Sequence, residues 1–173
     1  MSFNDREIST LGQNYFRFET ARLPSVSYYT QEVNLPNLFQ ESQDQPTIFG
    51  IPIKRPIGAY RFENLTLSFL VDEKMQNWFE IYKWMRHLGN IDTDNRNNEL
   101  RFDEFMTTGY LYITKGTYND NIKVIFHNMF PVALSGLKFI TDSPSNVSQK
   151  ATASFAYTYY SFDPDPGKTT TSF

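Results

Sequence analysis

Cysteine is absent from the 173 residues, which excludes disulfides, thiolate nucleophiles and cysteine-ligated metals. The first ten residues, MSFNDREIST, lack the basic and apolar regions of a secretion signal, so we expect synthesis in the cytoplasm. No apolar run approaches the roughly 20 residues that a membrane-spanning helix needs. The sequence therefore predicts a protein without disulfides and without a membrane partner.

Clustered positive charge is also lacking. The formal net charge is −3, and the densest basic spot is the pair Lys54-Arg55. Proteins that bind DNA through its phosphates usually carry a basic patch or stripe. A mildly acidic surface would instead suit a wall past which nucleic acid slides without sticking.

Motifs for catalysis or cofactor binding are missing as well. The chain has no G-x-S-x-G, no P-loop and no G-x-G-x-x-G. His87 and His127 lack the spacing of a metal motif, although an ion shared with a carboxylate such as Asp92 is an alternative to two ordinary histidines. A pair of carboxylates that meets only in the folded chain stays open. We expect no catalytic, cofactor or metal site, and hence no enzyme.

Aromatic residues, in contrast, are abundant. They make up 17% of the chain, with 16 Phe and 11 Tyr, and aromatic side chains favour strands and protein interfaces. Alternating apolar and polar residues, bounded by turn residues, predict about seven strands. These are expected at 14–23, 27–35, 60–71, 110–115, 122–134, 137–141 and 151–162.

A single helix is predicted at residues 73–88. Asp72 is a good N-cap and Gly89 a plausible C-terminal stop. An apolar stripe at helical spacing would pack this helix on a sheet. The stripe consists of Met75, Trp78, Phe79, Tyr82, Met85 and Leu88. Because strands do not alternate with helices, the pattern predicts a mainly β protein: an antiparallel β-sandwich or barrel with one flanking helix.

Residues 37–58 read as a long loop with three prolines, two glycines and no sustained period. Such loops are uncommon in compact domains and are usually functional or disordered, but a disordered linker should be poor in apolar residues. This segment carries Leu38, Phe39, Ile48, Phe49, Ile51, Ile53 and Ile57. Either the loop lies on another subunit or it folds over its own domain. We divide the chain into an N-terminal arm (1–13), one domain (14–162) and a C-terminal tail (163–173).

Four stretches of the sequence resemble the tail tube proteins of contractile-tailed bacteriophages. They are FRFETARLPSVSYYTQEVNLPNL (16–38), PIGAYRFENLTLSFLVDEKMQNWFEIYKWMRHLG (56–89), IKVIFHNMFPVALSGLKF (122–139) and ATASFAYTYYSF (151–162). The resemblance implies a structural virion protein of the phage tail. Its copies would form hexameric rings that stack into a tube, and strands from each copy would join one barrel around a lumen that conducts DNA without binding it specifically.

The resemblance also implies partners and surfaces. The loop at 37–58 would reach the adjacent ring. Separately from the resemblance, alternation in the strand at 27–35 places Glu32 and Asn34 on one face. We take Glu32, Asn34 and Glu63 as candidates to face the lumen. Expected partners are further copies of the chain, the sheath protein, the baseplate tube initiator and the tape measure protein. Alternatives are a tube-end protein (initiator or terminator) and the tube of a contractile injection system. A carbohydrate-binding sandwich or a small hydrolase is a further alternative, in which Tyr and Trp would stack on sugar.

Overall fold

The computed structural model describes residues 16–48, 50–89, 105–114, 121–140 and 148–163. The predicted N-terminal arm (1–13) lies outside these ranges, as does the predicted tail (163–173) apart from Asp163. Asp92, weighed above as a metal ligand, also lies outside them.

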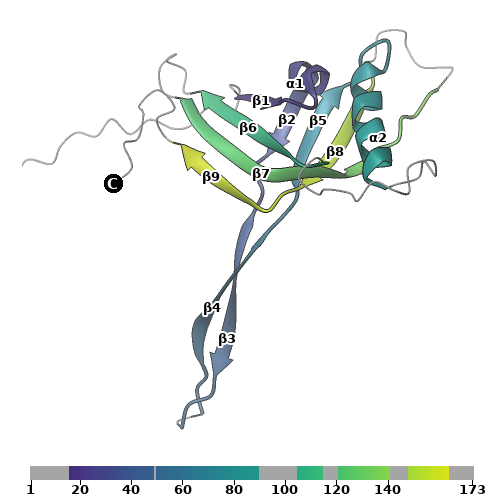
Figure 1. Ribbon diagram of the computed structural model, residues 1–173. Helices are drawn as coiled ribbons and strands as arrows, with labels where there is room; N and C mark the ends of the chain where they lie inside the picture. The colour runs from purple at the N-terminus through teal and green to yellow at the C-terminus, as the bar shows by residue number, and fades with distance from the viewer. Residues whose placement is uncertain (1–15, 49, 90–104, 115–120, 141–147, 164–173) are drawn as a thin grey trace, which may run out of the picture.

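The body of the protein is one antiparallel sheet of seven strands, which confirms the mainly β fold class predicted from the sequence (Figure 1). Its strands are β1 (Phe16–Thr20), β2 (Thr30–Asn34), β5 (Leu65–Leu70), β6 (Thr107–Thr114), β7 (Asn121–Leu134), β8 (Lys150–Ala156) and β9 (Tyr159–Asp163). They are ordered β1-β6-β7-β8-β5-β2, and β9 pairs with β7. Two further strands, β3 (Leu38–Gln45) and β4 (Ile53–Phe62), form a separate hairpin.

The long strand β7 divides the sheet into two layers. Its first part pairs with β6 on one side and β9 on the other, whereas residues 130–134 pair with β8. Between the two parts, Asn128 has a positive φ of 56°, a conformation that Asn tolerates better than most residues. One layer is therefore β1-β6-β7-β9, and the other, here called the four-stranded layer, is β2-β5-β8-β7.

The core lies between these layers and two helices, α1 (Pro24–Tyr29) and α2 (Gln76–Leu88). Strands β5 and β8 alternate strictly between buried and half-buried residues, so one face of each points into the core. The largest fully buried side chains are aromatic: Phe18, Phe69, Phe126 and Phe155.

Helix α2 begins three residues later than predicted. Met75, in the left-handed region with φ 55°, precedes it, and the Asp72 side chain makes no capping hydrogen bond. Asn77 satisfies the backbone instead: its Oδ1 accepts the Trp78 N–H at 2.8 Å, and its Nδ2 donates to the Leu70 carbonyl at 2.6 Å. The predicted cap is wrong because Asn77 takes over this role from inside the first turn.

The buried face of α2 also differs from the predicted stripe. Asn77, Ile81 and Trp84 are buried, and Trp84 Nε1 donates to the Phe105 carbonyl at 2.9 Å. Trp78, Met85 and Leu88 pack at the edge of the core, but Phe79 and Tyr82 are exposed. The buried face of α2 begins with Asn77, which is polar. A pattern of hydrophobic residues does not detect a buried amide, so the predicted stripe was displaced.

Four strand predictions are corrected as well. Residues 24–29 form α1, because Pro24 at its first turn and the buried Leu23 and Val26 favour a helix over a strand beginning at 27. The predicted strand at 60–71 divides between β4 and β5, and the one at 151–162 between β8 and β9. Residues 137–140 form no strand.

Candidate assembly surfaces

The hairpin of β3 and β4, here called the arm, projects away from the body (Figure 1). The prediction of an irregular loop at 37–58 is wrong. The strands pair from Leu38 with Phe62 to Gln45 with Ile53, and a turn closes them, in which the Gly50 N–H donates to the Thr47 carbonyl at 3.1 Å. A register shift between Gln40 and Ser42, together with the prolines, hides the period-two pattern in the sequence.

The arm exposes apolar side chains along its length. Of the predicted contact residues that the structure describes, all are exposed: Leu38, Phe39, Ile48, Ile51, Ile53 and Ile57. Phe49 lies outside the described residues. Tyr60 is also exposed and was missed, because the sequence places it in a body strand. A lone two-stranded hairpin is marginally stable in water, and exposed apolar side chains along one are typical of an interaction surface.

An aromatic cluster holds the base of the arm on the body. The Phe62 ring lies 5.9 Å from that of Tyr157 and 5.3 Å from that of Tyr160. The residues that flank the two strands of the arm are hydrogen-bonded to each other. Asn37 Nδ2 donates to Glu63 Oε2 at 2.9 Å, and the Glu63 N–H donates to the Asn37 carbonyl at 3.1 Å. The arm therefore leaves the body from a defined point where its two ends meet.

The outer face of the four-stranded layer is polar. Thr66 and Ser154 pair across β5 and β8 with hydroxyl oxygens 3.4 Å apart, as do Ser68 and Thr152. The register places Asn34 beside Thr66 and Glu32 beside Ser68, which extends both rows onto β2. Two of the predicted lumen residues, Glu32 and Asn34, thus share one exposed face. Glu63 lies apart from them, at the base of the arm.

The four-stranded layer has two free edges among the described strands. Strand β2 pairs only with β5, and residues 130–134 of β7 pair only with β8. Because each strand is antiparallel to the next, the second edge of this layer runs antiparallel to the first. A copy related by rotation could therefore join edge to edge in a continuous antiparallel sheet.

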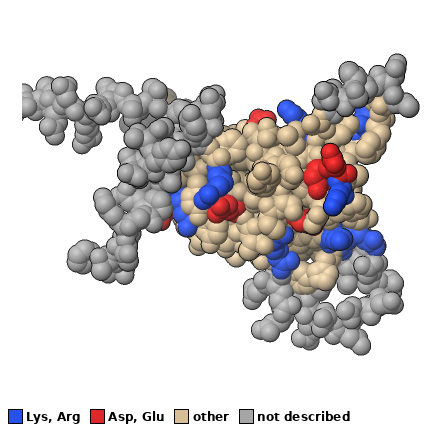
Figure 2. All heavy atoms as spheres, turned by 90° about the horizontal axis from the view of Figure 1, so that it is seen from above, with Lys and Arg blue, Asp and Glu red and all other residues tan. Residues whose placement is uncertain are grey.

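The described residues form neither a basic stripe on the face drawn in Figure 2 nor a group that could bind a metal ion. In Figure 2, basic and acidic side chains appear as small separate groups among uncharged residues, without a basic stripe. His127 Nε2 lies 3.0 Å from Ser161 Oγ, and its ring stacks on Tyr159, whereas His87 contacts Phe105. Within the described ranges, no group of three or more His, Asp or Glu could hold a metal ion. No helix in the same ranges is long and apolar enough to cross a membrane.

Known proteins resemble this chain in sequence or in fold. The tail tube terminator protein of Enterobacteria phage T4 is 26% identical over 113 residues, which cover 65% of this chain and 62% of that protein. The match therefore spans less than two thirds of that relative's length. The tube terminating cap of the anti-feeding prophage superposes with a TM-score of 0.65 at 14% identity, covering 95% of this chain and 99% of the cap chain.

A chain of the sheath/tube terminator of an extracellular contractile injection system gives a TM-score of 0.64 at 13% identity, with 90% of this chain and 97% of that chain covered. These structural likenesses establish the fold. The family model described as phage tail tube protein matches residues 2–163, which is most of the sequence. The chain belongs to the phage tail tube protein family and is a structural component of a phage tail, not an enzyme.

Proposed function

We propose that this chain is the terminator of a phage tail tube, a protein that forms the ring at the end of the tube. The observation that carries a ring is the four-stranded layer with two free, mutually antiparallel edges. The end position is supported by the phage T4 relative, a tail tube terminator protein, and by two structural neighbours, one from a tube terminating cap and one from a sheath/tube terminator. The sequence alone favours a tube subunit, with a tube-end protein (initiator or terminator) as an alternative.

In the proposed ring, β2 of one copy pairs with residues 130–134 of β7 of the next, giving a hexamer closed by backbone hydrogen bonds. The outer face of the four-stranded layer then lines the lumen, with Glu32 and Asn34 on it. Hydroxyl pairs and the scarcity of basic side chains would let DNA pass without being held. Glu63, at the base of the arm, would sit at the rim instead.

The arm contacts the last ring of the tube in this proposal. Its apolar side chains would be buried there, which removes the instability of an isolated hairpin. The partners are then other copies of the chain, the tube subunit and the end of the sheath. The tape measure protein and the baseplate initiator would be neighbours of a tube subunit instead.

A tube-body subunit is the second candidate, because the matching family model is that of tube proteins. Adding purified protein to isolated tail tubes, followed by electron microscopy, separates the two. A terminator adds one ring and blocks further growth by tube subunits. A tube subunit lengthens the tubes and polymerises without a template. Failure to form rings, with or without tubes, would refute both.

The arm is tested by deletion. Since Asn37 and Glu63 are hydrogen-bonded to each other and Phe62 packs on the body, replacing residues 38–61 by a short glycine linker should leave the body folded. We expect the deleted variant to lose the circular dichroism signal of β3 and β4, to keep a cooperative urea unfolding transition, and to lose binding to tubes. A matched control is Gln43→Ala, which alters one exposed polar residue in the arm and should bind normally. Tube binding by the deleted variant would show that the arm does not make the ring contact.

A further inference from the structure

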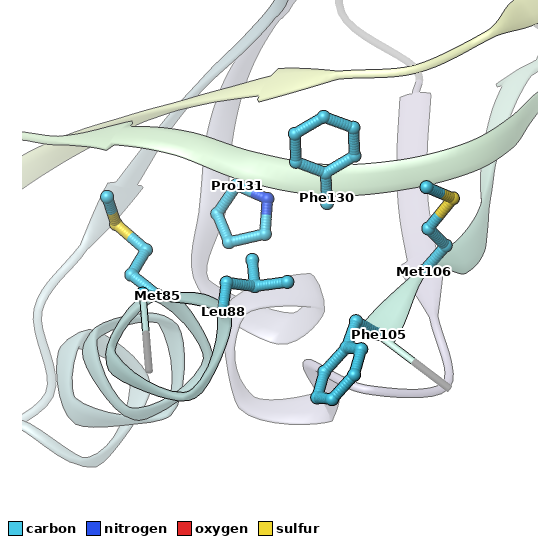
Figure 3. Close-up of a pocket in the computed structure, with 7 residues that line it drawn as sticks. Met85, Leu88, Phe105, Met106, Phe130 and Pro131 are labelled. Atoms are coloured by element: carbon cyan, nitrogen blue, oxygen red, sulfur yellow. The ribbon is translucent and has the colours of Figure 1, made fainter. Parts of the chain in front are cut away.

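An apolar pocket of about 470 Å³ opens between α2 and β7. Figure 3 shows Met85 and Leu88 on the helix, Phe130 and Pro131 on β7, and Phe105 and Met106 just before β6, gathered around one space. Apolar side chains that remain in contact with water at such a site favour a partner that would bury them.

The pocket lies at the free edge of β7. Strand β6 pairs with β7 only as far as Thr107 with Met129, and Phe105 and Met106 precede this point. Beyond it, β8 is the only strand among the described residues that pairs with residues 130–134. A strand added to this edge would therefore continue in line with β6 and pass directly beside Met106 and Pro131.

The neighbouring copy in the proposed ring brings β2 to this edge. Its direction is antiparallel to β7, so its last residues lie at the Phe130 end, beside the pocket. Faces also match. Val33 pairs with the buried Leu67, and Pro131 pairs with the buried Phe155, so both point to the core side of the layer. Leu35, two residues after Val33, is expected on that same side.

Leu35 is only partly covered by the described residues. It is 43% exposed, although the residue after it, Pro36, is buried. An exposed leucine directly after an edge strand, and an apolar pocket at the opposite edge of the layer, are complementary surfaces of one chain. Two different surfaces that fit each other make a head-to-tail contact, which closes into a ring under rotation.

We propose that Leu35 of one copy inserts into the α2–β7 pocket of its ring neighbour and fixes the register of the seam between them. This inference rests on the ring of the proposed function and adds the side chain that locks it. The tip of the arm is a competing occupant, because Ile48 is fully exposed. Leu35 is the better fit, since pairing of the two edges delivers it to the pocket without any further contact.

Disulfide cross-linking tests the contact directly, because the natural chain has no cysteine. The double variant Leu35→Cys/Leu88→Cys should give a ladder of covalent oligomers on oxidation of assembled rings, and each single variant should give at most dimers. Ile48→Cys/Leu88→Cys and Tyr28→Cys/Leu88→Cys are matched controls. The first probes the arm tip, and the second an exposed residue before the other end of β2. Neither should produce a ladder.

The outcomes separate the two proposals. If rings form but Leu35→Cys/Leu88→Cys gives no ladder, Leu35 does not occupy the pocket, and the proposed ring still stands. A ladder from Ile48→Cys/Leu88→Cys would show that the tip of the arm occupies the pocket. If the unmodified protein forms no rings, even on tail tubes, the proposed function itself fails.

A second measurement does not depend on cross-linking. Leu35→Asp should raise the concentration needed for ring assembly at least tenfold, because a carboxylate would enter an apolar pocket. Leu35→Met, which keeps an apolar side chain of similar volume, should assemble within about twofold of the natural protein. Equal assembly of Leu35→Asp and the natural protein would overturn the proposal. The urea midpoint of the monomer controls for folding.

Discussion

Asn77 connects the end of β5 to the start of α2 through one buried side chain. It is fully buried, donates to the Leu70 carbonyl and accepts from the Trp78 N–H. Both backbone groups would otherwise lack these partners in a part of the molecule from which water is largely excluded. A buried amide with this much hydrogen bonding stabilises a junction that apolar packing alone would leave undefined.

We therefore expect Asn77→Ala to lower the free energy of unfolding by about 2–4 kcal/mol, since each orphaned backbone group costs about 1–3 kcal/mol. Urea denaturation measures this loss. Gln76→Ala, at the exposed neighbouring position, is the control and should change stability by less than about 0.5 kcal/mol. Equal effects of the two substitutions would contradict the role given to Asn77.

Tyr157 predicts a pH dependence. Burial, with smaller contributions from Tyr160 and Glu63, raises the pKa of Tyr157 to about 12. An unfolded tyrosine has a pKa of about 10. The fold favours the neutral phenol, so its contribution to stability is complete below about pH 10 and is lost as the pH rises toward 12. Tyr157→Phe should make the fall in urea midpoint over this range shallower than in the natural protein.

The same substitution has a consequence at neutral pH. The Tyr157 hydroxyl is buried and has no hydrogen-bond partner among the described residues. Removing it should leave stability at pH 7 unchanged or slightly higher, because no bond is lost. A clear destabilisation at pH 7 would show that the hydroxyl has a partner outside the described ranges.

At the scale of elements, α2 covers the core through one face and leaves aromatic rings on the other. Trp84 is almost fully buried and contacts the Phe155 ring. Phe79 is 43% exposed and contacts only the neighbouring rings of Trp78 and Tyr82 among the aromatic residues described. The two positions therefore differ strongly in what a truncation would remove.

Trp84→Ala should destabilise the fold by about 3–5 kcal/mol, as is usual for truncating a large buried aromatic. Phe79→Ala should cost less than about 1 kcal/mol, because most of the lost area is at the surface. Thermal and urea denaturation of both variants check the difference. A larger effect at Phe79 would restore the stripe predicted from the sequence.

The elements also show how far the sequence predicts this fold. Strict alternation in β5 and β8 made both strands visible, because one of their faces is buried and the other is polar. The arm lacked that signal, since nearly all of its residues are exposed and a register shift interrupts the period. Its exposed apolar residues could still be identified by composition. Helix α1 was hidden because six residues give too short a periodic pattern.

The assembly surfaces depended on long-range pairing, which a single sequence reveals only in part. Glu32 and Asn34 were placed on one face by period two within a single strand. Their neighbours Thr66 and Ser154 come from strands far apart in the chain, and the pocket draws on α2, β7 and the residues before β6. Local patterns do not specify which strands become neighbours, so the edges and the pocket appear only in the folded chain.

At the scale of the whole molecule, the free edge of β7 is the surface most sensitive to added charge. Val132 is exposed in the middle of residues 130–134. Charged side chains, especially lysine, are a common means of preventing edge-to-edge pairing. Val132→Lys should therefore abolish rings in electron microscopy and leave the monomer folded. Val132→Thr, which stays β-branched and uncharged, should still form them. Rings of Val132→Lys would place the seam elsewhere.

The meeting of Asn37 and Glu63 at the base of the arm has a consequence for how such a protein can change. Whatever lies between these two residues can lengthen, shorten or be exchanged as a unit, because the strand registers of the body do not pass through it. The arm can therefore change its stacking partner while the body keeps the geometry of the ring. One body of this kind could serve tubes with different ends through a cassette of some two dozen residues.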